Sequence, residues 1–140
     1  MDRLEIIDLK QVIKTDYRFL YQILKEREMD TNISHKKMPT YNEHIDFVQS
    51  KPYSKWYIIY FGRKKVGSVY ISKQNEIGIF IKRKFLKKGI GTKVLKIILE
   101  KNPKKRFLAN INPKNKKSIE FFKKNGFKLL QKTYELQVKK

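Results

Sequence analysis

Two glycines set in a run of lysines are the residues of this sequence with the clearest capacity for chemistry. Lys87-Lys88-Gly89-Ile90-Gly91 follows a short apolar segment and precedes a largely apolar stretch, residues 92–101. If that stretch is a helix, its first turn exposes unpaired backbone N–H groups and a partial positive charge. Glycine has no Cβ, so an anion can approach the backbone closely. The segment predicts a phosphate-binding turn, although a strand-to-helix turn can also need glycine for its geometry alone.

The surroundings of this turn are strongly basic. Residues 82–106 include eleven Lys or Arg and one acid, and the whole chain has 34 Lys and Arg against 13 Asp and Glu, a net charge of +21. A field of this sign attracts phosphorylated ligands. Because the lysines are spread over the whole chain, they also fit a generally lysine-rich proteome. The alternative, a nucleic-acid-binding module, requires lysines gathered on one face with exposed aromatics such as Tyr53, Trp56 and Tyr57 between them.

Length and composition narrow the classes of protein. The 140 residues suit a single domain, 1–140, with one core. The chain has no cysteine, which excludes thiolate catalysis and cysteine-ligated zinc, and we expect no metal. A cytoplasmic location is expected, since the N-terminus lacks the pattern of a signal peptide and the longest apolar run, 56–61, is too short to span a bilayer.

The spacing of apolar residues predicts the elements that must position the turn. Helical spacing predicts helices at 16–27, 40–50, 92–101 and 115–124, with a capping box formed by Thr40 and Glu43. Alternation predicts strands at 4–9, 56–61, 66–72, 76–81, 107–112 and 127–138. The turns at Gly62 and 73–75 make the middle strands antiparallel neighbours. The strand-helix-strand unit around the turn predicts an α/β (α+β) fold with a mixed, mostly antiparallel central sheet and helices packed on it.

The turn resembles the signature of the GNAT acetyltransferases, (Gln/Arg)-x-x-Gly-x-(Gly/Ala). Aligning Gly89 and Gly91 places Leu86 at the first position, where the family has a polar side chain that assists the pyrophosphate. A second segment resembles the C-terminal motif of the same family, Asn-x-x-(Ala/Ser)-x-x-x-(Tyr/Phe)-x-x-x-Gly-Phe, and runs from Asn115 to Phe127. The interval between the two motifs holds one helix and one strand, as the family fold demands.

The resemblance implies acetyl-CoA as co-substrate, bound where the strand before the turn splays from the next strand. By carry-over, backbone groups near residues 79–81 hold pantetheine and polarise the thioester carbonyl, and residues 87–92 wrap the pyrophosphate. The expected cofactor-binding residues are Ile79, Phe80, Ile81, Lys87, Lys88, Gly89, Ile90, Gly91, Thr92, Asn115 and Phe122.

Acyl transfer needs a base for the amine and an acid for the departing thiolate. The family often takes the acid from a tyrosine of its second motif, but this chain has Phe122 there. Tyr134 on the last predicted strand is a candidate substitute, beside water. Glu76, which opens a Glu-Ile-Gly run also found in other branches of the family, and His44 are candidate bases.

The acceptor-side region, residues 26–50, resembles that of GNAT members acting on amino-sugar nucleotides, through the Glu43-His44 pair. A similar pair occurs in members that acetylate protein N-termini. The positive charge fits a nucleotide-sugar diphosphate better than a polyamine. We therefore expect a small-molecule primary amine as acceptor, an amino-sugar nucleotide among the candidates, and a monomer or homodimer with no membrane partner. The missing tyrosine leaves open a GNAT domain that binds acetyl-CoA without catalysis.

Overall fold

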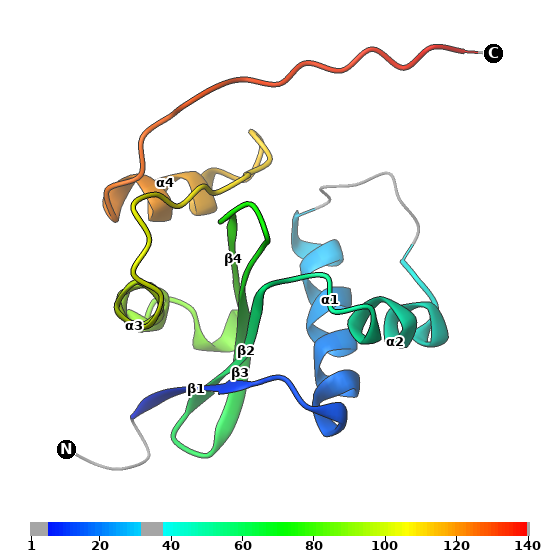
Figure 1. Ribbon diagram of the computed structural model, residues 1–140, viewed down its shortest axis with the longest axis vertical. Coiled ribbons are helices and arrows are strands. Elements are labelled where there is room, and N and C mark those ends of the chain that lie inside the picture. Colours follow the sequence, from blue (N-terminus) through cyan, green and yellow to red (C-terminus); the bar gives the residue numbers. More distant parts are fainter. Residues whose placement is uncertain (1–5, 32–37, 140) are drawn as a thin grey trace.

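A four-stranded sheet separates two layers of helices in the computed structural model, which describes residues 6–31 and 38–139 (Figure 1). Each strand pairs antiparallel with the next in the chain. The strands, in this order across the sheet, are β1 (Ile7–Gln11), β2 (Lys55–Phe61), β3 (Lys64–Ile71) and β4 (Ile77–Ile81). The α+β class expected from the sequence is confirmed.

Helices cover both faces of this sheet. In Figure 1, α1 (Tyr17–Thr31) and α2 (Tyr41–Gln49) lie on one side, and α3 (Ile90–Lys101) and α4 (Lys116–Lys124) on the other. Two short 3-10 turns, η2 (Lys14–Asp16) and η3 (Arg83–Phe85), precede α1 and α3. All four helices were expected from apolar spacing, with ends that differ by a few residues.

The sheet has a core on each face because successive side chains of a strand point to opposite sides. Ile58 and Ile59, neighbours on β2, are both fully buried. Ile59 packs in the cluster that includes Val94 and Ile98 of α3, whereas Ile58 packs with the residues Leu20, Ile23 and Val48 of α1 and α2. Fully burying an aliphatic side chain contributes roughly 1.5–3 kcal/mol, so both helical layers are held to the sheet by burial.

The capping box at the start of α2 is confirmed. The hydroxyl of Thr40 accepts a hydrogen bond from the backbone N–H of Glu43 at 3.2 Å, and the Glu43 carboxylate accepts one from the backbone N–H of Thr40 at 2.8 Å. These bonds satisfy two backbone donors that a helix start otherwise leaves open. They fix where α2 begins, next to His44.

The first strand begins three residues later and ends two residues later than predicted. It spans Ile7–Gln11, and positions 4–5 of the predicted strand lie outside the described residues. Its register against β2 places Leu9 opposite Ile59, which puts Leu9 in the buried cluster on the α3 face.

The predicted strands at 107–112 and 127–138 are wrong. In the first segment, one parallel bridge joins Leu108 to Glu76, and the chain then leaves the sheet. The second segment is extended but unpaired and runs away from the body of the protein (Figure 1). Side chains such as Tyr134 and Leu136 are 87% and 85% exposed there. β-branched and aromatic residues favour a strand only where a neighbouring edge receives them. The first segment meets the edge of β4 at a single bridge, and the second segment is not paired with any strand among the described residues.

Substituting Gly67 with alanine should destabilise the fold. A Cβ on Gly67 would overlap the backbone carbonyl oxygen of Phe80 on the neighbouring strand. Backbone in a paired strand cannot move aside without separating β3 from β4, so we expect a loss of about 1–3 kcal/mol in the free energy of unfolding. Urea unfolding of Gly67→Ala against wild type measures it. Equal stabilities would show that the two strands do not pack as closely as the structure has them.

Candidate active site

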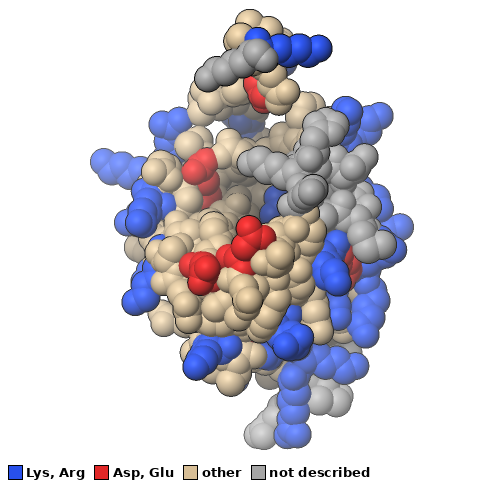
Figure 2. All heavy atoms as spheres, turned by 90° about the vertical axis from the view of Figure 1, so that its right-hand side faces the viewer, with Lys and Arg blue, Asp and Glu red and all other residues tan. Residues whose placement is uncertain are grey.

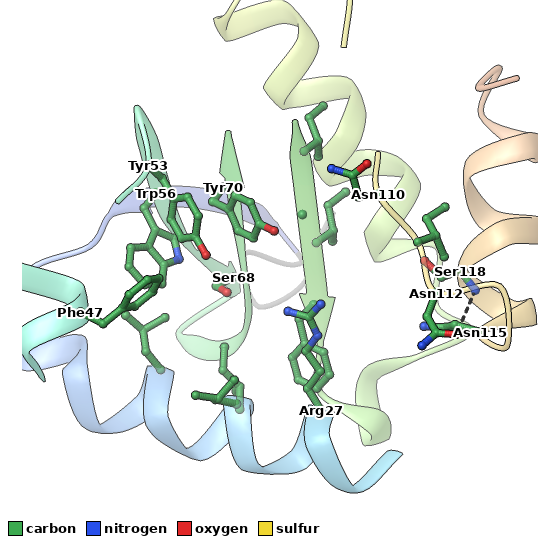
Figure 3. A pocket seen from close by; sticks show the side chains of 18 of the residues that line it. Arg27, Phe47, Tyr53, Trp56, Ser68, Tyr70, Asn110, Asn112, Asn115 and Ser118 are labelled. Atoms are coloured by element: carbon green, nitrogen blue, oxygen red, sulfur yellow. Dashed lines mark hydrogen bonds between the residues drawn. The ribbon is translucent and has the colours of Figure 1, made fainter. Parts of the chain in front are cut away.

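Strand β4 and residues 107–112 are joined at one bridge and then separate. The backbone N–H of Ile77 donates to the carbonyl oxygen of Leu108 at 2.7 Å, and the N–H of Leu108 donates to that of Asn75 at 2.9 Å. Beyond this bridge, residues 77–80 and 110–112 become two walls of a cavity of about 550 Å³ (Figure 3). This is the splayed pair that the resemblance implied.

Glu76 ties the two segments together just before they part. Its carboxylate accepts a hydrogen bond from the Ser72 hydroxyl at 3.0 Å and another from the side-chain amide of Asn110. Ser72 in turn accepts from the backbone N–H of Glu76 at 3.0 Å. Glu76 was a candidate base, but it does not belong to the cavity lining among the described residues. Its contacts are those of a structural brace at the apex of the gap.

The outer edge of β4 presents alternate backbone groups to the gap. The bonds from Ser72 N–H to Glu76 carbonyl and from Lys82 N–H to Val66 carbonyl show that the even-numbered residues of β4 bond to β3. In an antiparallel pair the residues between them point their N–H and C=O groups outward. Ile79 and Ile81 therefore face the gap with their backbone, as expected. The backbone of Phe80 pairs with Ser68 of β3, and its side chain lines the cavity.

The predicted phosphate turn has the geometry of an open helix start. Gly89 caps α3 in the left-handed conformation, φ +74°, and a Cβ there would meet no atom within 4 Å. Lys87 also has positive φ, and both it and Lys88 are exposed. The first backbone bond of α3 runs from Lys93 N–H to the Gly89 carbonyl. The N–H groups of residues 90–92 precede that bond and belong to the open first turn.

The structure gives other reasons for several residues of the turn. A Cβ on Gly91 would lie 2.9 Å from a ring carbon of Phe121, so this glycine lets α3 and α4 approach each other. The side chain of Ile90 is buried in the core, and only its backbone is free for a ligand. The Thr92 hydroxyl lies 3.4 Å from the Asn125 side-chain amide nitrogen.

The two residues predicted from the second motif line the cavity. Asn115 caps α4 by accepting the backbone N–H of Ser118 at 3.1 Å (Figure 3). Phe122 is buried and meets the rings of Phe121 and Phe127 edge to face. Phe122 therefore serves as a packing ring and carries no proton donor.

Four aromatic rings form the opposite side of the cavity: Phe47, Tyr53, Trp56 and Tyr70. Tyr53 and Tyr70 stack with ring centroids 3.8 Å apart, and Trp56 meets Tyr53 edge to face at 4.7 Å. We call these four residues the aromatic wall. They pack on one another, and Tyr57 is buried in the core. The exposed aromatic surface that nucleic-acid binding requires is therefore not built from Tyr53, Trp56 and Tyr57.

Sequence reasoning missed the pairing of Tyr70 with Gly78. These residues are cross-strand neighbours on β3 and β4, and a Cβ on Gly78 would overlap the Tyr70 ring. The glycine of the Glu-Ile-Gly run is thus needed so that Tyr70 can lie across β4. A glycine inside a predicted strand is itself a signal of such a close approach.

His44 reaches the cavity from α2 with one nitrogen free. It is 4% exposed, and its pKa is lowered by burial, partly offset by a hydrogen bond with the backbone of Tyr17. Nε2 is buried and has no hydrogen-bond partner among the described residues. The indole N–H of Trp56 is likewise buried and unpartnered in the part of the chain described.

One candidate is not at this site, and part of another predicted region is not described. Tyr134 lies on the exposed C-terminal segment, and the structure does not bring it to the cavity. Residues 32–37 of the acceptor-side region lie outside the described residues. Within residues 6–31 and 38–139, no cluster of three His, Asp or Glu could hold a metal ion, and no helix is long and apolar enough to cross a membrane.

The sequence profile of the acetyltransferase (GNAT) family matches residues 17–127, most of the chain. The protein belongs to the GNAT acetyltransferase family. Members of this family use acetyl-CoA and acetylate an amine, so this GNAT protein is an acetyl-CoA-dependent N-acetyltransferase whose acceptor the match does not identify.

Solved structures similar to this GNAT protein share its fold. A domain from Methanocaldococcus jannaschii is 27% identical, with a TM-score of 0.79 and 93% of each chain covered. An acetyltransferase from Thermus thermophilus is 18% identical, with a TM-score of 0.74 over 89% of this chain and 88% of that one. A predicted acetyltransferase with acetyl-CoA from Clostridium acetobutylicum is 14% identical, with a TM-score of 0.72 over 94% and 96%. No curated protein matches the sequence.

The burial of His44 should make stability depend on pH. Its pKa is lower in the folded protein than the ordinary 6.5, so below about pH 6.5 the unfolded chain binds a proton that the folded one resists. Stability is therefore fully present above that pH and declines as the pH falls. We expect the free energy of unfolding to drop less between pH 7.5 and 5.5 in His44→Gln than in wild type, by urea unfolding. Parallel pH dependences in the two proteins would contradict the burial of a neutral imidazole.

Proposed function

We propose that the enzyme transfers acetyl from acetyl-CoA to the primary amine of a small molecule, with an amino sugar carried on a nucleotide as the acceptor class. The observation that carries the proposal is the cavity at the splay of β4. One side of it is β4, whose outward backbone N–H groups lie on the strand that precedes the basic turn. The other side has aromatic rings, and there His44 Nε2 and Trp56 Nε1 have no hydrogen-bond partner among the described residues. The two sides suit two different ligands that meet at β4.

The β4 side fits coenzyme A. The outward backbone of Ile79 and Ile81 can pair with the amides of pantetheine as a neighbouring strand would. At the end of this edge, the open backbone of Gly89 stands at the start of α3 with Lys87 and Lys88 beside it. Such a helix start favours a pyrophosphate through its N–H groups and its dipole. Leu86, where the family has a polar side chain, is 42% exposed, and its side chain cannot hydrogen-bond the pyrophosphate. The backbone and the lysines must therefore bind it.

The backbone N–H of Ile79 is our candidate for polarising the thioester carbonyl. It points from the middle of β4 into the gap. Charge develops on that carbonyl oxygen when the amine attacks, and a fixed donor aimed at it lowers the barrier without reorganising. Since only backbone is recruited, the side chain of Ile79 remains free to pack against the core on the α3 face.

The aromatic wall can pack against a sugar ring. Aromatic faces carry negative charge density and attract the polarised C–H groups of a sugar. Trp56 Nε1 can donate a hydrogen bond to a hydroxyl group of the sugar. Arg27, which lines the same cavity and lies close enough to Tyr53 to affect its ionisation, is positioned for a phosphate.

The charges on this face fit an acceptor with both an amine and phosphates. Figure 2 shows Lys and Arg around the edge of the face that carries α1 and α2, and acidic side chains toward its middle. Glu43, whose pKa is lowered by its bonds to Thr40, lines the cavity as a carboxylate. The basic rim attracts the anionic part of the acceptor, and the central carboxylate favours its ammonium group. His44 Nε2 is our candidate to remove the proton from that ammonium group.

Replacing Gly89 with aspartate should abolish binding of acetyl-CoA. Asp and Asn both tolerate positive φ and have nearly the same shape, but Asp adds a negative charge where the pyrophosphate would lie. Gly89→Asn is therefore the matched control. Millimolar acetyl-CoA should raise the melting temperature of wild type and Gly89→Asn by several degrees, and that of Gly89→Asp hardly at all. Equal shifts in the two variants would mean that the pyrophosphate does not bind at this turn.

Replacing Trp56 with phenylalanine should weaken binding of the acceptor and not of acetyl-CoA. The variant keeps a ring in the aromatic wall and loses the buried donor Nε1. Loss of one hydrogen bond of about 1 kcal/mol raises KM for the acceptor roughly fivefold.

Thiol release on a panel tests this together with the acceptor class: a nucleotide-linked amino sugar, the free amino sugar, a polyamine and a peptide with a free N-terminus. The proposal expects the first to have the highest kcat/KM. Preference for the peptide or the polyamine would overturn it.

A further inference from the structure

The proton for the departing thiolate has no donor at the position where the family often keeps one. Phe122 occupies that position and is enclosed by Phe121 and Phe127. Tyr134, the substitute suggested by the sequence, is 87% exposed on a segment that leaves the protein. A donor from another element would have to reach β4 beside the outward N–H of Ile79.

Tyr70 reaches this place from β3. Its ring lies across Gly78, and a Cβ on that glycine would be 2.5 Å from the Tyr70 hydroxyl oxygen. Figure 3 shows the hydroxyl pointing from β3 toward β4. Gly78 directly precedes Ile79, so the phenol hydroxyl and the outward N–H lie at neighbouring points of the same strand, on the wall of the cavity.

We propose that Tyr70 is the catalytic proton relay of this acetyltransferase, an inference that rests on the proposed function. As the amine nitrogen forms its bond to the acetyl carbon and the C–S bond breaks, the Tyr70 hydroxyl gives its proton to the thiolate sulfur. The Tyr70 oxygen then accepts a proton from the positively charged nitrogen of the new amide. The net change is one proton moved from nitrogen to sulfur, and Tyr70 ends as it began.

Tyr53 supports this role through its contact with Tyr70. The two rings are stacked with their centroids 3.8 Å apart. Burial, followed by the neighbouring Tyr70, raises the pKa of Tyr53, while the charge of Arg27 acts in the opposite direction. The Tyr53 hydroxyl therefore stays protonated and can donate to the Tyr70 oxygen while that oxygen carries negative charge. Tyr53 is a positioning residue in this arrangement.

The test is Tyr70→Phe, which keeps the ring over Gly78 and the stack on Tyr53 and removes one oxygen. We expect kcat to fall about 100-fold, at the lower end of what a positioned acid or base contributes. KM for the acceptor and the melting shift with acetyl-CoA should stay within about twofold, since loss of a transition-state contact lowers kcat and kcat/KM together. Tyr60→Phe is the matched control, a tyrosine of β2 that does not line the cavity.

A solvent deuterium isotope effect on kcat separates a chemical role from a structural one. We expect Tyr70→Phe to change the effect relative to wild type, because proton transfer is then carried by water, and Tyr60→Phe to leave it as it was. An active wild type with the same kcat and isotope effect in Tyr70→Phe would overturn the relay while leaving the proposed function intact. A wild type that binds acetyl-CoA but acetylates no amine would overturn both. A Tyr70→Phe that loses the acetyl-CoA shift along with kcat would mark the residue as structural and also overturn the relay.

Discussion

The parting of β4 from the segment that follows α3 is the constraint on which the site depends. Among the described residues these segments share the bridge between Glu76 and Leu108, and the Glu76 carboxylate holds both Ser72 and Asn110 at that point. A full ladder would consume the outward backbone of Ile79 and Ile81 and close the cavity. A gap with no bridge would leave the two walls without a fixed separation. The single bridge between Glu76 and Leu108 fixes the distance between the two segments at the point where the gap begins.

The two helical layers contribute in different ways to the chemistry at this gap. On the α3 side, side chains such as Ile90 pack in the core, and the proposed ligand contacts use the backbone of the turn and of β4. On the α1 and α2 side, the side chains themselves line the cavity, including His44 and the aromatic wall. β4 serves both, because odd-numbered residues pack toward α3 while Gly78 and Phe80 face the other layer.

Local signals in the sequence predicted what is local in the structure. The capping box at Thr40 and the helices that follow Gly89 and Asn115 each depend on a few adjacent residues and were predicted. Contacts between distant segments were not. Phe121 against Gly91 and Tyr70 against Gly78 need a register that spacing alone does not supply. The C-terminal alternation around Tyr134 was interpreted as a strand because β-propensity does not reveal whether an edge is present to pair with it.

The division of labour across β4 has an evolutionary consequence. In the proposed arrangement the coenzyme side recruits mainly backbone atoms, so substitutions there need only preserve φ angles and packing, as at Gly89 and Ile90. The acceptor side is lined by side chains of α1, α2 and the strands, and Glu26 of α1 accepts a hydrogen bond from the backbone N–H of Arg83 before α3. With this arrangement, evolution can replace Phe47 or Trp56 and change the accepted amine while the proposed backbone contacts with acetyl-CoA stay the same.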